Sequence, residues 1–319
     1  MTPLTVPPVP KFQVRLEPPD IDMWRAGNSG VRGFTSRSGS PDGPHVALLA
    51  LSHGNEIAGA IVLDRLLRSG LKPNRGKLTF GFVNLDAFDR FDPRQPTLSR
   101  FVDEDINRVW DEKLLDGPRR SSELARAREI RPLIDTVDIL LDLHSMLWPS
   151  VPLMLSGGAD KGRRLALGIG VPELIVADRG HAGGRRLIDY KRFSDPATSH
   201  AANLIEAGQH WEPATVETTL SAVAGLLRYV GMGLLGPALP ISARIRQQVA
   251  EVTVTVTAET LSFSFVQPWR GGDVVARRNT LIALDGNIEV RTPHDQCLLV
   301  MPSLRPSRGH TAVRLARFV

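Results

Sequence analysis

Residues 45–70, HVALLALSHGNEIAGAIVLDRLLRSG, decide the fold class of this chain. The first seven residues are a continuous apolar run, which is typical of a buried strand. From residue 56 onward apolar side chains such as Ile57 and Ile61 recur at helical spacing, and Gly70 is placed to end the helix. A short polar turn joins the two. The stretch therefore predicts a strand followed by a helix.

The same alternation continues along the chain. Further strands are predicted at residues 77–85, 137–145, 172–178 and 201–208, and further helices at residues 121–134 and 217–232. Strands that alternate with helices are typical of an α/β fold with a mostly parallel or mixed sheet covered by helices. In the N-terminal 44 residues we expect a strand at FQVRLEP (12–18) and another near GVRGFTS (30–36).

After about residue 245 the pattern changes to apolar and polar residues in alternation, with turn signals at RGGD, LDGN and TPHD. A Gly- and Pro-rich stretch, residues 233–244, separates this part from the rest. We therefore expect an α/β domain over residues 1–240 and a smaller all-β domain over residues 245–319. The chain has no lysine after Lys191, so this β domain is not a biotin or lipoate carrier.

Composition excludes several classes of protein. The 319 residues are 42% apolar and 23% charged, as expected of a soluble globular protein, and neither a signal peptide nor a membrane span is indicated. The single cysteine, Cys297, agrees with a cytoplasmic location. The net charge is +5, but the basic residues are scattered, so we expect no nucleic-acid partner.

Ionisable residues fall where the predicted parallel strands end. His53 and Glu56 follow the strand at 45–51, His144 closes the strand at 137–145, and Glu206 lies near the end of the strand at 201–208. Ligand sites of such sheets form beyond the carboxyl ends of the strands. We expect these four side chains to share one edge of the sheet.

His53, Glu56 and His144 form a two-histidine, one-carboxylate set, which is common at catalytic zinc sites. Gly54 gives the turn between the first two residues conformational freedom. Asp142 or a nearby carbonyl group could orient His144 through its second ring nitrogen. Zinc at this site would lower the pKa of a bound water to about 7.

Hydrolysis of an amide also needs a base and a group that stabilises the oxyanion. Glu206 is the carboxylate left for the base. Arg100, Asn107 and Arg108, all within SRFVDEDINRVW, could supply a cation for the oxyanion and a polar fork for a substrate carboxylate.

Each of these signals is weak by itself. With 8 histidines and 34 acidic residues in the chain, chance alone gives about one His-x-x-acid pair. A lone His144 would more often be a hydrogen-bonded core residue, DINR a solvated turn, and Glu206 a helix cap. The order of all of them along successive strand ends favours the metal site.

Four motifs, SHGNEIAG, RFVDEDINR, LLDLHS and LIEAGQ, occur in this order over about residues 45–235. Together they resemble the succinylglutamate desuccinylase and aspartoacylase family, which is related to zinc carboxypeptidases. The resemblance implies a carboxypeptidase-like α/β domain with a C-terminal β domain. It also implies hydrolysis of an N-acyl amino acid or a similar amide to a carboxylate and an amine.

The resemblance assigns one zinc ion to His53, Glu56 and His144. It makes Glu206, followed by Ala207 and Gly208, the catalytic glutamate. It also gives Arg100 the role of polarising the scissile carbonyl group, and gives Asn107 and Arg108 the role of holding the substrate carboxylate.

Two positions depart from the aspartoacylase pattern. The arginine that recognises a second substrate carboxylate is replaced by Pro196, and no tyrosine follows Tyr229. Arg185, Arg186 and Arg192 are candidates for the missing cation, although a solvated basic loop is the simpler interpretation. Both departures count against N-acetylaspartate as substrate.

We therefore predict a zinc-dependent amidohydrolase that acts on a small, carboxylate-bearing N-acyl substrate. Its partner would be that small molecule rather than nucleic acid or a membrane, and a homo-oligomer is compatible with the sequence. Two alternatives stay open: cleavage of the C-terminal residue from a short peptide, and a non-catalytic binding protein that keeps the fold.

Overall fold

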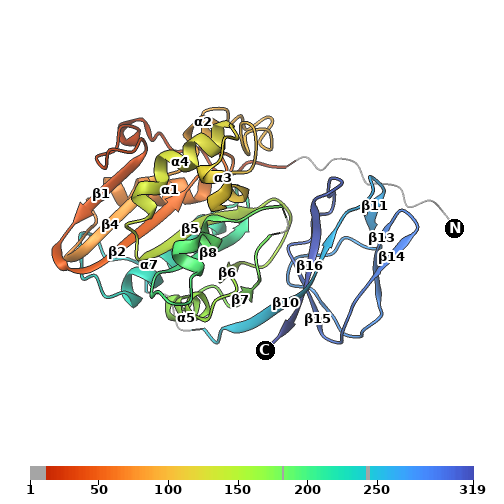
Figure 1. The fold of residues 1–319 in the computed structure, drawn as a ribbon. Coiled ribbons are helices and arrows are strands. Elements are labelled where there is room, and N and C mark those ends of the chain that lie inside the picture. Colours follow the sequence, from red (N-terminus) through yellow and green to blue (C-terminus); the bar gives the residue numbers. More distant parts are fainter. Residues whose placement is uncertain (1–11, 182, 242–244) are drawn as a thin grey trace.

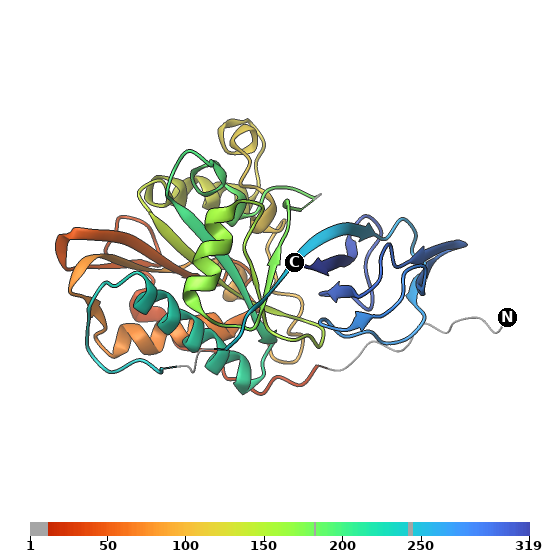
Figure 2. The same ribbon diagram turned by 90° about the horizontal axis from the view of Figure 1, so that it is seen from below.

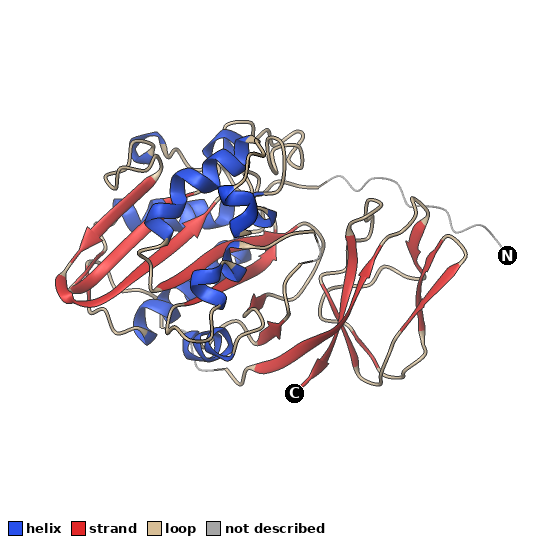
Figure 3. Cartoon of the chain, viewed as in Figure 1, coloured by secondary structure: helices blue, strands red, loops and turns tan. Residues whose placement is uncertain are grey.

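A computed structural model describes residues 12–181, 183–241 and 245–319. Figure 1 shows the chain with its elements labelled, and Figure 3 shows the same view coloured by secondary structure. The helices are α1 (Ile57–Arg68), α2 (Leu85–Phe88), α3 (Glu112–Asp116), α4 (Ser122–Ile134), α5 (Asp160–Ile169), α6 (Lys191–Ser194) and α7 (Pro213–Tyr229), with short 3₁₀ turns η1 (Asp22–Trp24), η2 (Ile106–Arg108) and η3 (Leu187–Asp189). None of these helices is long and apolar enough to cross a membrane.

The strands form one large sheet and two small ones. They are β1 (Phe34–Ser38), β2 (Ser40–Ala50), β3 (Lys72–Pro73), β4 (Arg75–Phe82), β5 (Ile139–Met146), β6 (Leu153–Leu155), β7 (Leu174–Ala177), β8 (Ala201–Gln209), β9 (Leu234–Leu235), β10 (Gln248–Thr257), β11 (Phe263–Phe265), β12 (Val274–Val275), β13 (Leu281–Asp285), β14 (Ile288–Arg291), β15 (Cys297–Val300) and β16 (Thr311–Phe318). The order in the large sheet is β1-β4-β2-β5-β8-β6-β7-β10-β16-β15-β12.

The large sheet is mixed, as predicted. Strands β4, β2, β5 and β8 are neighbours and run parallel, whereas β1 and β6 pair antiparallel with β4 and β8. Side chains of a strand alternate between its two faces. In β2, Leu48 packs in the core shared with α1, α5 and α7, and Leu49 packs in the core shared with α3 and α4 on the opposite face. Helices therefore cover both faces of this part of the sheet.

The C-terminal part is all-β, also as predicted (Figures 2 and 3). Strand β10 joins the two parts of the sheet. It pairs parallel with β7 of the α/β part and antiparallel with β16 of the C-terminal part. The large sheet therefore runs without interruption from the α/β part into the C-terminal part. Strands β11, β13 and β14 form a separate small sheet beside it, and a third hydrophobic cluster fills the space around Phe263 and Leu299.

The predicted strand at residues 12–18 is wrong. This segment belongs to no sheet and bends at Leu16, although the main-chain N–H of Arg15 donates a hydrogen bond to the carbonyl oxygen of Trp211. Phe12, Val14 and Leu16 pack against the core, which explains their alternation in the sequence. The strand expected near residues 30–36 begins later, at Phe34 of β1.

Candidate active site

The site lies where three neighbouring parallel strands end. Ala50, the last residue of β2, stands opposite Leu143 of β5, and His144 stands opposite Glu206 of β8. Because the three strands run parallel, their carboxyl ends meet at the same edge of the sheet. The sequence-predicted residues on these strands and in the turn after β2 are brought together in this way.

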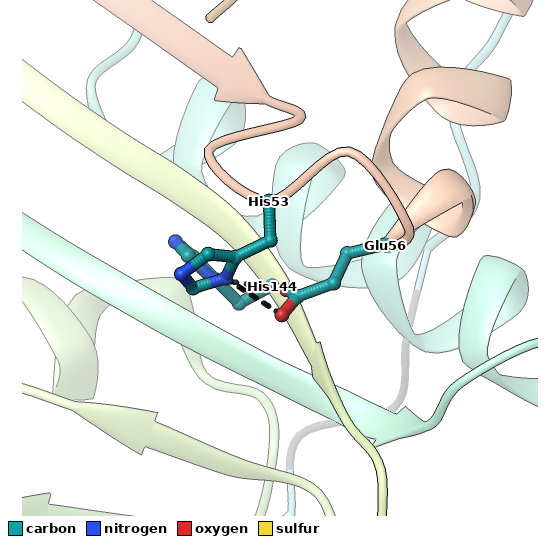
Figure 4. A group of neighbouring side chains, drawn as sticks. All are labelled: His53, Glu56 and His144. Carbon is teal, nitrogen blue, oxygen red and sulfur yellow. Dashed lines mark hydrogen bonds and ion pairs between the residues drawn. The ribbon is translucent and has the colours of Figure 1, made fainter. Parts of the chain in front are cut away.

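His53, Glu56 and His144 form a buried group whose potential ligand atoms all lie within 4.8 Å of one another. Figure 4 shows His53 reaching in from the turn after β2, Glu56 from the start of α1, and His144 from β5. The Nδ1 atom of His53 lies 2.7 Å from one carboxylate oxygen of Glu56, and the Nδ1 atom of His144 lies 2.9 Å from the other. Three electron-pair donors therefore face a common centre.

The second nitrogen of each imidazole contacts an aspartate. His53 Nε2 lies 2.9 Å from Asp105, and His144 Nε2 lies 2.8 Å from Asp142. An Nε2–H that donates to a carboxylate fixes the ring and leaves the Nδ1 lone pair pointing to the centre. This is the arrangement found around metal-binding histidines. Asp142 was expected from the sequence, whereas Asp105 was not.

The three side chains also interact electrostatically with one another. Burial opposes the ionisation of Glu56, but the charges of His53 and His144 outweigh it and hold the pKa of this carboxyl well below its usual range. Burial likewise opposes a charge on His144, but Asp142 and Glu56 raise its pKa well above the ordinary value. Two imidazoles and one carboxylate are a donor set that fits Zn²⁺.

The turn that carries His53 and Glu56 is held by the surrounding backbone. The N–H of Gly54 donates to the carbonyl oxygen of Arg100 at 3.1 Å, and Trp211 Nε1 donates to the carbonyl oxygen of Asn55 at 2.9 Å. A Cβ atom on Gly54 would lie only 2.4 Å from the main-chain carbon of Ala87. Gly54 is therefore needed for close packing against α2, rather than for the conformational freedom that we expected.

Glu206 is half-buried on β8 and faces the same cavity as the metal-ligating group. Its Oε2 atom is buried and has no hydrogen-bond partner among the described residues. Burial, followed by the charge of Glu56, raises the pKa of Glu206 to about 8. A cation held by Glu56 and the two histidines would act in the opposite direction and favour the carboxylate form.

Arg100 and Arg108 are linked to this group through Asp105. Arg100 donates to Glu56 Oε1 at 3.1 Å and to Asp105 Oδ2 at 3.3 Å, and Arg108 Nη2 lies 3.5 Å from the same Asp105 oxygen. Asp105 also accepts a hydrogen bond from the N–H of Asn107, which stabilises the first turn of η2. Both guanidinium groups line the cavity.

The side-chain amide of Asn107 is bonded to protein groups at both ends. Its oxygen accepts from the N–H of Leu187 at 2.7 Å, and its Nδ2 atom lies 3.2 Å from Asp142 Oδ2, to which it donates, and 3.1 Å from His144 Nε2. Asn107 thus supports the His144–Asp142 pair. Arg108 in turn donates to the carbonyl oxygen of Asn107 at 2.6 Å. The roles of Asn107 and Arg108 in substrate binding stay predictions.

The cavity has a volume of about 650 Å³ and lies between the α/β part and the C-terminal β part. Thr311 and Arg314 of β16 and Met301, which follows β15, line it from the β side. A smaller recess of about 150 Å³, bordered by Met146 and Trp148, shares Glu206, Arg100 and Met301 with it. Met301 has a left-handed backbone with φ 48°, which is uncommon for a residue with a side chain.

The other residues considered from the sequence do not offer a free cation here. Arg185 is half-exposed and lies 3.3 Å from Asp111, Arg186 is buried against Asp178 and Asp189, and Arg192 donates to the carbonyl oxygen of Val137. Pro196 is exposed and does not line the cavity.

Comparisons with known proteins agree with this geometry. Residues 42–147 match the model of the succinylglutamate desuccinylase/aspartoacylase catalytic domain. This segment includes all of the candidate residues named above for the metal, Arg100, Asn107 and Arg108, whereas Glu206 lies beyond it. Mouse (Mus musculus) aspartoacylase is 29% identical over 111 residues, a match that spans 31% of this chain and only 33% of the mouse protein.

The likeness of fold extends over nearly the whole chain. The succinylglutamate desuccinylase structure from Vibrio parahaemolyticus has a TM-score of 0.67 at 17% identity and covers 92% of this chain and 89% of its own. That from Vibrio cholerae has a TM-score of 0.69 at 16% identity, with 90% and 85% covered. Residues 42–147 thus match the model of the succinylglutamate desuccinylase/aspartoacylase catalytic domain, and the fold of the whole chain resembles that of the two succinylglutamate desuccinylase structures.

Proposed function

We propose that this chain hydrolyses the amide bond of a small N-acylated amino acid, or of a related carboxylate-bearing amide, with the help of zinc. The observation that carries the proposal is the position of Glu206. The Glu206 side chain, one oxygen of which has no hydrogen-bond partner among the described residues, lines the same cavity as His53, His144 and Arg100. A base, a cation and a metal-ligating group around one cavity are the parts that such a hydrolysis needs.

In this proposal His53, Glu56 and His144 are the zinc ligands. Zinc held there would act as a Lewis acid and lower the pKa of a bound water to about 7. Glu206 takes the proton of the attacking water and returns it to the leaving amine. The guanidinium group of Arg100 stabilises the negative charge that develops on the carbonyl oxygen.

The two parts of the cavity suit the two parts of the substrate. Arg108, supported by Asn107, binds the carboxylate of the amino acid in the larger space. The acyl group enters the recess beside Met146 and Trp148. The volume of this recess, about 150 Å³, favours a short acyl chain. In this division residues 1–240 form the hydrolase domain, and residues 245–319 form a β domain that closes the cavity.

The test is amine release by zinc-loaded protein from a panel of N-acyl amino acids that vary in acyl length and side chain, with dipeptides in the same panel. We expect release from short N-acyl amino acids and slower turnover of dipeptides. Faster turnover of dipeptides would favour a peptidase. Zinc binding without any turnover would favour a non-catalytic binding protein.

A further inference from the structure

Strand β16 carries an arginine that the functions assigned so far do not use. Side chains of a strand alternate between its faces. In β16, Val313 and Leu315 pack in the core of the C-terminal part, and Arg314 between them points to the other side, where it lines the active-site cavity. Arg314 is buried, with 6% of its surface exposed.

Arg314 has no carboxylate of its own among the described residues. Its Nε atom is buried without a hydrogen-bond partner, and its ion-pair contact is with Asp178 Oδ2, at 3.7 Å. Both oxygens of Asp178 already accept hydrogen bonds from Arg186, which is further paired with Asp189. Asp178 is therefore held by a closer partner, and the guanidinium group of Arg314 lines the cavity at a longer distance from this carboxylate.

Charged side chains of both signs surround Arg314, among them Asp178, Arg186 and Glu206. Arg108 and Arg314 line one cavity, and His181, which lies between the two parts of the fold, contacts Thr311 of β16 through Nε2 at 3.3 Å. Burial, and then the charges of Arg108 and Arg314, lower the pKa of His181 to about 3, so this imidazole is neutral. An anionic ligand in the cavity would give the buried guanidinium group of Arg314 a closer partner than Asp178.

We propose that Arg314 is a specificity residue that binds a second carboxylate, on the side chain of the amino-acid part of the substrate. The inference rests on the proposed function, in which Arg108 holds the first carboxylate of the same amino acid. A guanidinium group can bind a carboxylate through two parallel hydrogen bonds. The other positions considered for binding a second carboxylate are not available. Pro196 is exposed and carries no charge, and the remaining candidates are bound to other protein groups: Arg185, Arg186 and Arg192.

The test compares substrates that differ only in the second charge. Zinc-loaded protein is assayed with N-acetyl-L-glutamate against N-acetyl-L-glutamine, and with N-acetyl-L-aspartate against N-acetyl-L-asparagine for the shorter spacing. We expect the wild type to prefer one acid over its amide by about 10- to 100-fold, mainly through KM, as for a hydrogen bond to a charged group. Arg314→Met should reduce this preference to within about twofold without affecting the amide, and Arg314→Lys should keep part of it.

The matched control is Arg317→Met, because Arg317 is exposed on the same strand and lies outside the cavity. It should keep the preference of the wild type. Circular dichroism and thermal melting show whether each variant folds. A wild type without any preference for the acids, or a folded Arg314→Met variant that keeps it, would overturn the inference.

A binding measurement separates this inference from the proposed function. Titration calorimetry with L-glutamate and L-glutamine, and with L-aspartate and L-asparagine, needs no turnover. If no N-acyl amino acid is hydrolysed, the proposed function fails. A preference for binding an acid over its amide that Arg314→Met removes would then still support a carboxylate site at Arg314. Equal binding of acids and amides, or no binding of any of them, would overturn it.

Discussion

His144 and Glu206 stand opposite one another on the neighbouring parallel strands β5 and β8. A strand register of this kind sets the distance between two functional groups through the backbone, because adjacent strands are about 4.8 Å apart. The candidate metal ligand His144 and the proposed base Glu206 are therefore placed by the sheet rather than by loops. The glutamate and the second histidine of the metal group come from the turn after β2, the next strand along.

Glu206→Gln should reduce kcat by at least about 100-fold, because the amide cannot take a proton from water. Zinc content should stay at that of the wild type, since Glu206 is not among the proposed ligands. Both are measured on the same preparation, by amine release and by elemental analysis. Glu217→Gln on α7 is the control with a similar change far from the catalytic carboxylates. Unchanged turnover would remove Glu206 from the role of base.

His53→Ala should lose stoichiometric zinc, because it removes one of three ligands.

Asp105→Asn keeps the ligands but weakens the hydrogen bond that orients His53, so we expect zinc affinity to fall by about 10- to 100-fold. Competition with a coloured chelator measures both. His200→Ala is the control, because His200 lies near Asp138, at the opposite end of β5 from the metal group. Full zinc retention by His53→Ala would contradict the ligand assignment.

The sequence predicted the α/β part well because its strands and helices carry strong periodicity. The apolar run in β2 and the helical spacing of α1 both reflect burial of these elements in the core. Helix α5 was missed because its sequence, DKGRRLALGI, has two glycines and three basic residues that weaken the helical pattern. The strand at residues 12–18 was predicted wrongly, since alternation reports which side chains face the core and not whether a neighbouring strand is there.

The candidate site was predictable to the extent that strand ends could be placed. His53, Glu56, His144 and Glu206 each follow or close an apolar run, so the rule for parallel sheets brought them together. The role of Asp105 as a partner of His53 was hardly predictable from the sequence. The only hint was that Asp105 lies two residues before Asn107, within a motif already considered for the site. Arg314 had none, because its contact with the cavity depends on how β16 lies against the α/β part.

Arg108→Ala should raise KM by about 10- to 100-fold and change kcat less, because it removes binding to a part of the substrate that does not react. Burial, and then the nearby cations, lower the pKa of Arg108 to about 10, so it is still charged at pH 7. Steady-state kinetics with an N-acyl amino acid measure the effect. Arg185→Ala, in the neighbouring loop, should leave both constants unchanged. An unaltered KM in Arg108→Ala would show that the carboxylate binds elsewhere.

Gly54→Ala should destabilise the protein by about 1–3 kcal/mol and weaken zinc binding, because the added Cβ meets backbone atoms of Ala87, Phe88 and Ser99 within 2.6 Å. The turn can relieve these contacts only by moving, and His53 moves with it. Urea unfolding and zinc competition measure the two effects. Gly158→Ala is the matched control, since the nearest approach of its added Cβ to another segment is 3.3 Å, to the carbonyl oxygen of Asp178. Equal losses in the two variants would argue against a special role for Gly54.

His45 should make the protein less stable as the pH falls. It is buried at the start of the apolar run of β2, with Nε2 2.7 Å from the hydroxyl of Thr79 and Nδ1 3.1 Å from the carbonyl oxygen of Thr136. Burial, and then the charge of Lys77, lower the pKa of His45 to about 4. The unfolded chain binds this proton below about pH 6.5, whereas the folded chain binds it only below about pH 4. The free energy of unfolding should therefore decrease between these values.

The measurement is urea unfolding at pH 7.5, 5.5 and 4.5 on protein treated with chelator, so that the pH dependence of metal binding does not contribute. His45→Gln lacks the titrating group, and its stability should fall less over this range than that of the wild type. We expect a difference of about 2 kcal/mol after allowance for partial exposure. His310→Gln, which replaces an exposed histidine, should follow the wild type. If His45→Gln and the wild type lose stability equally, folding does not lower the pKa of His45.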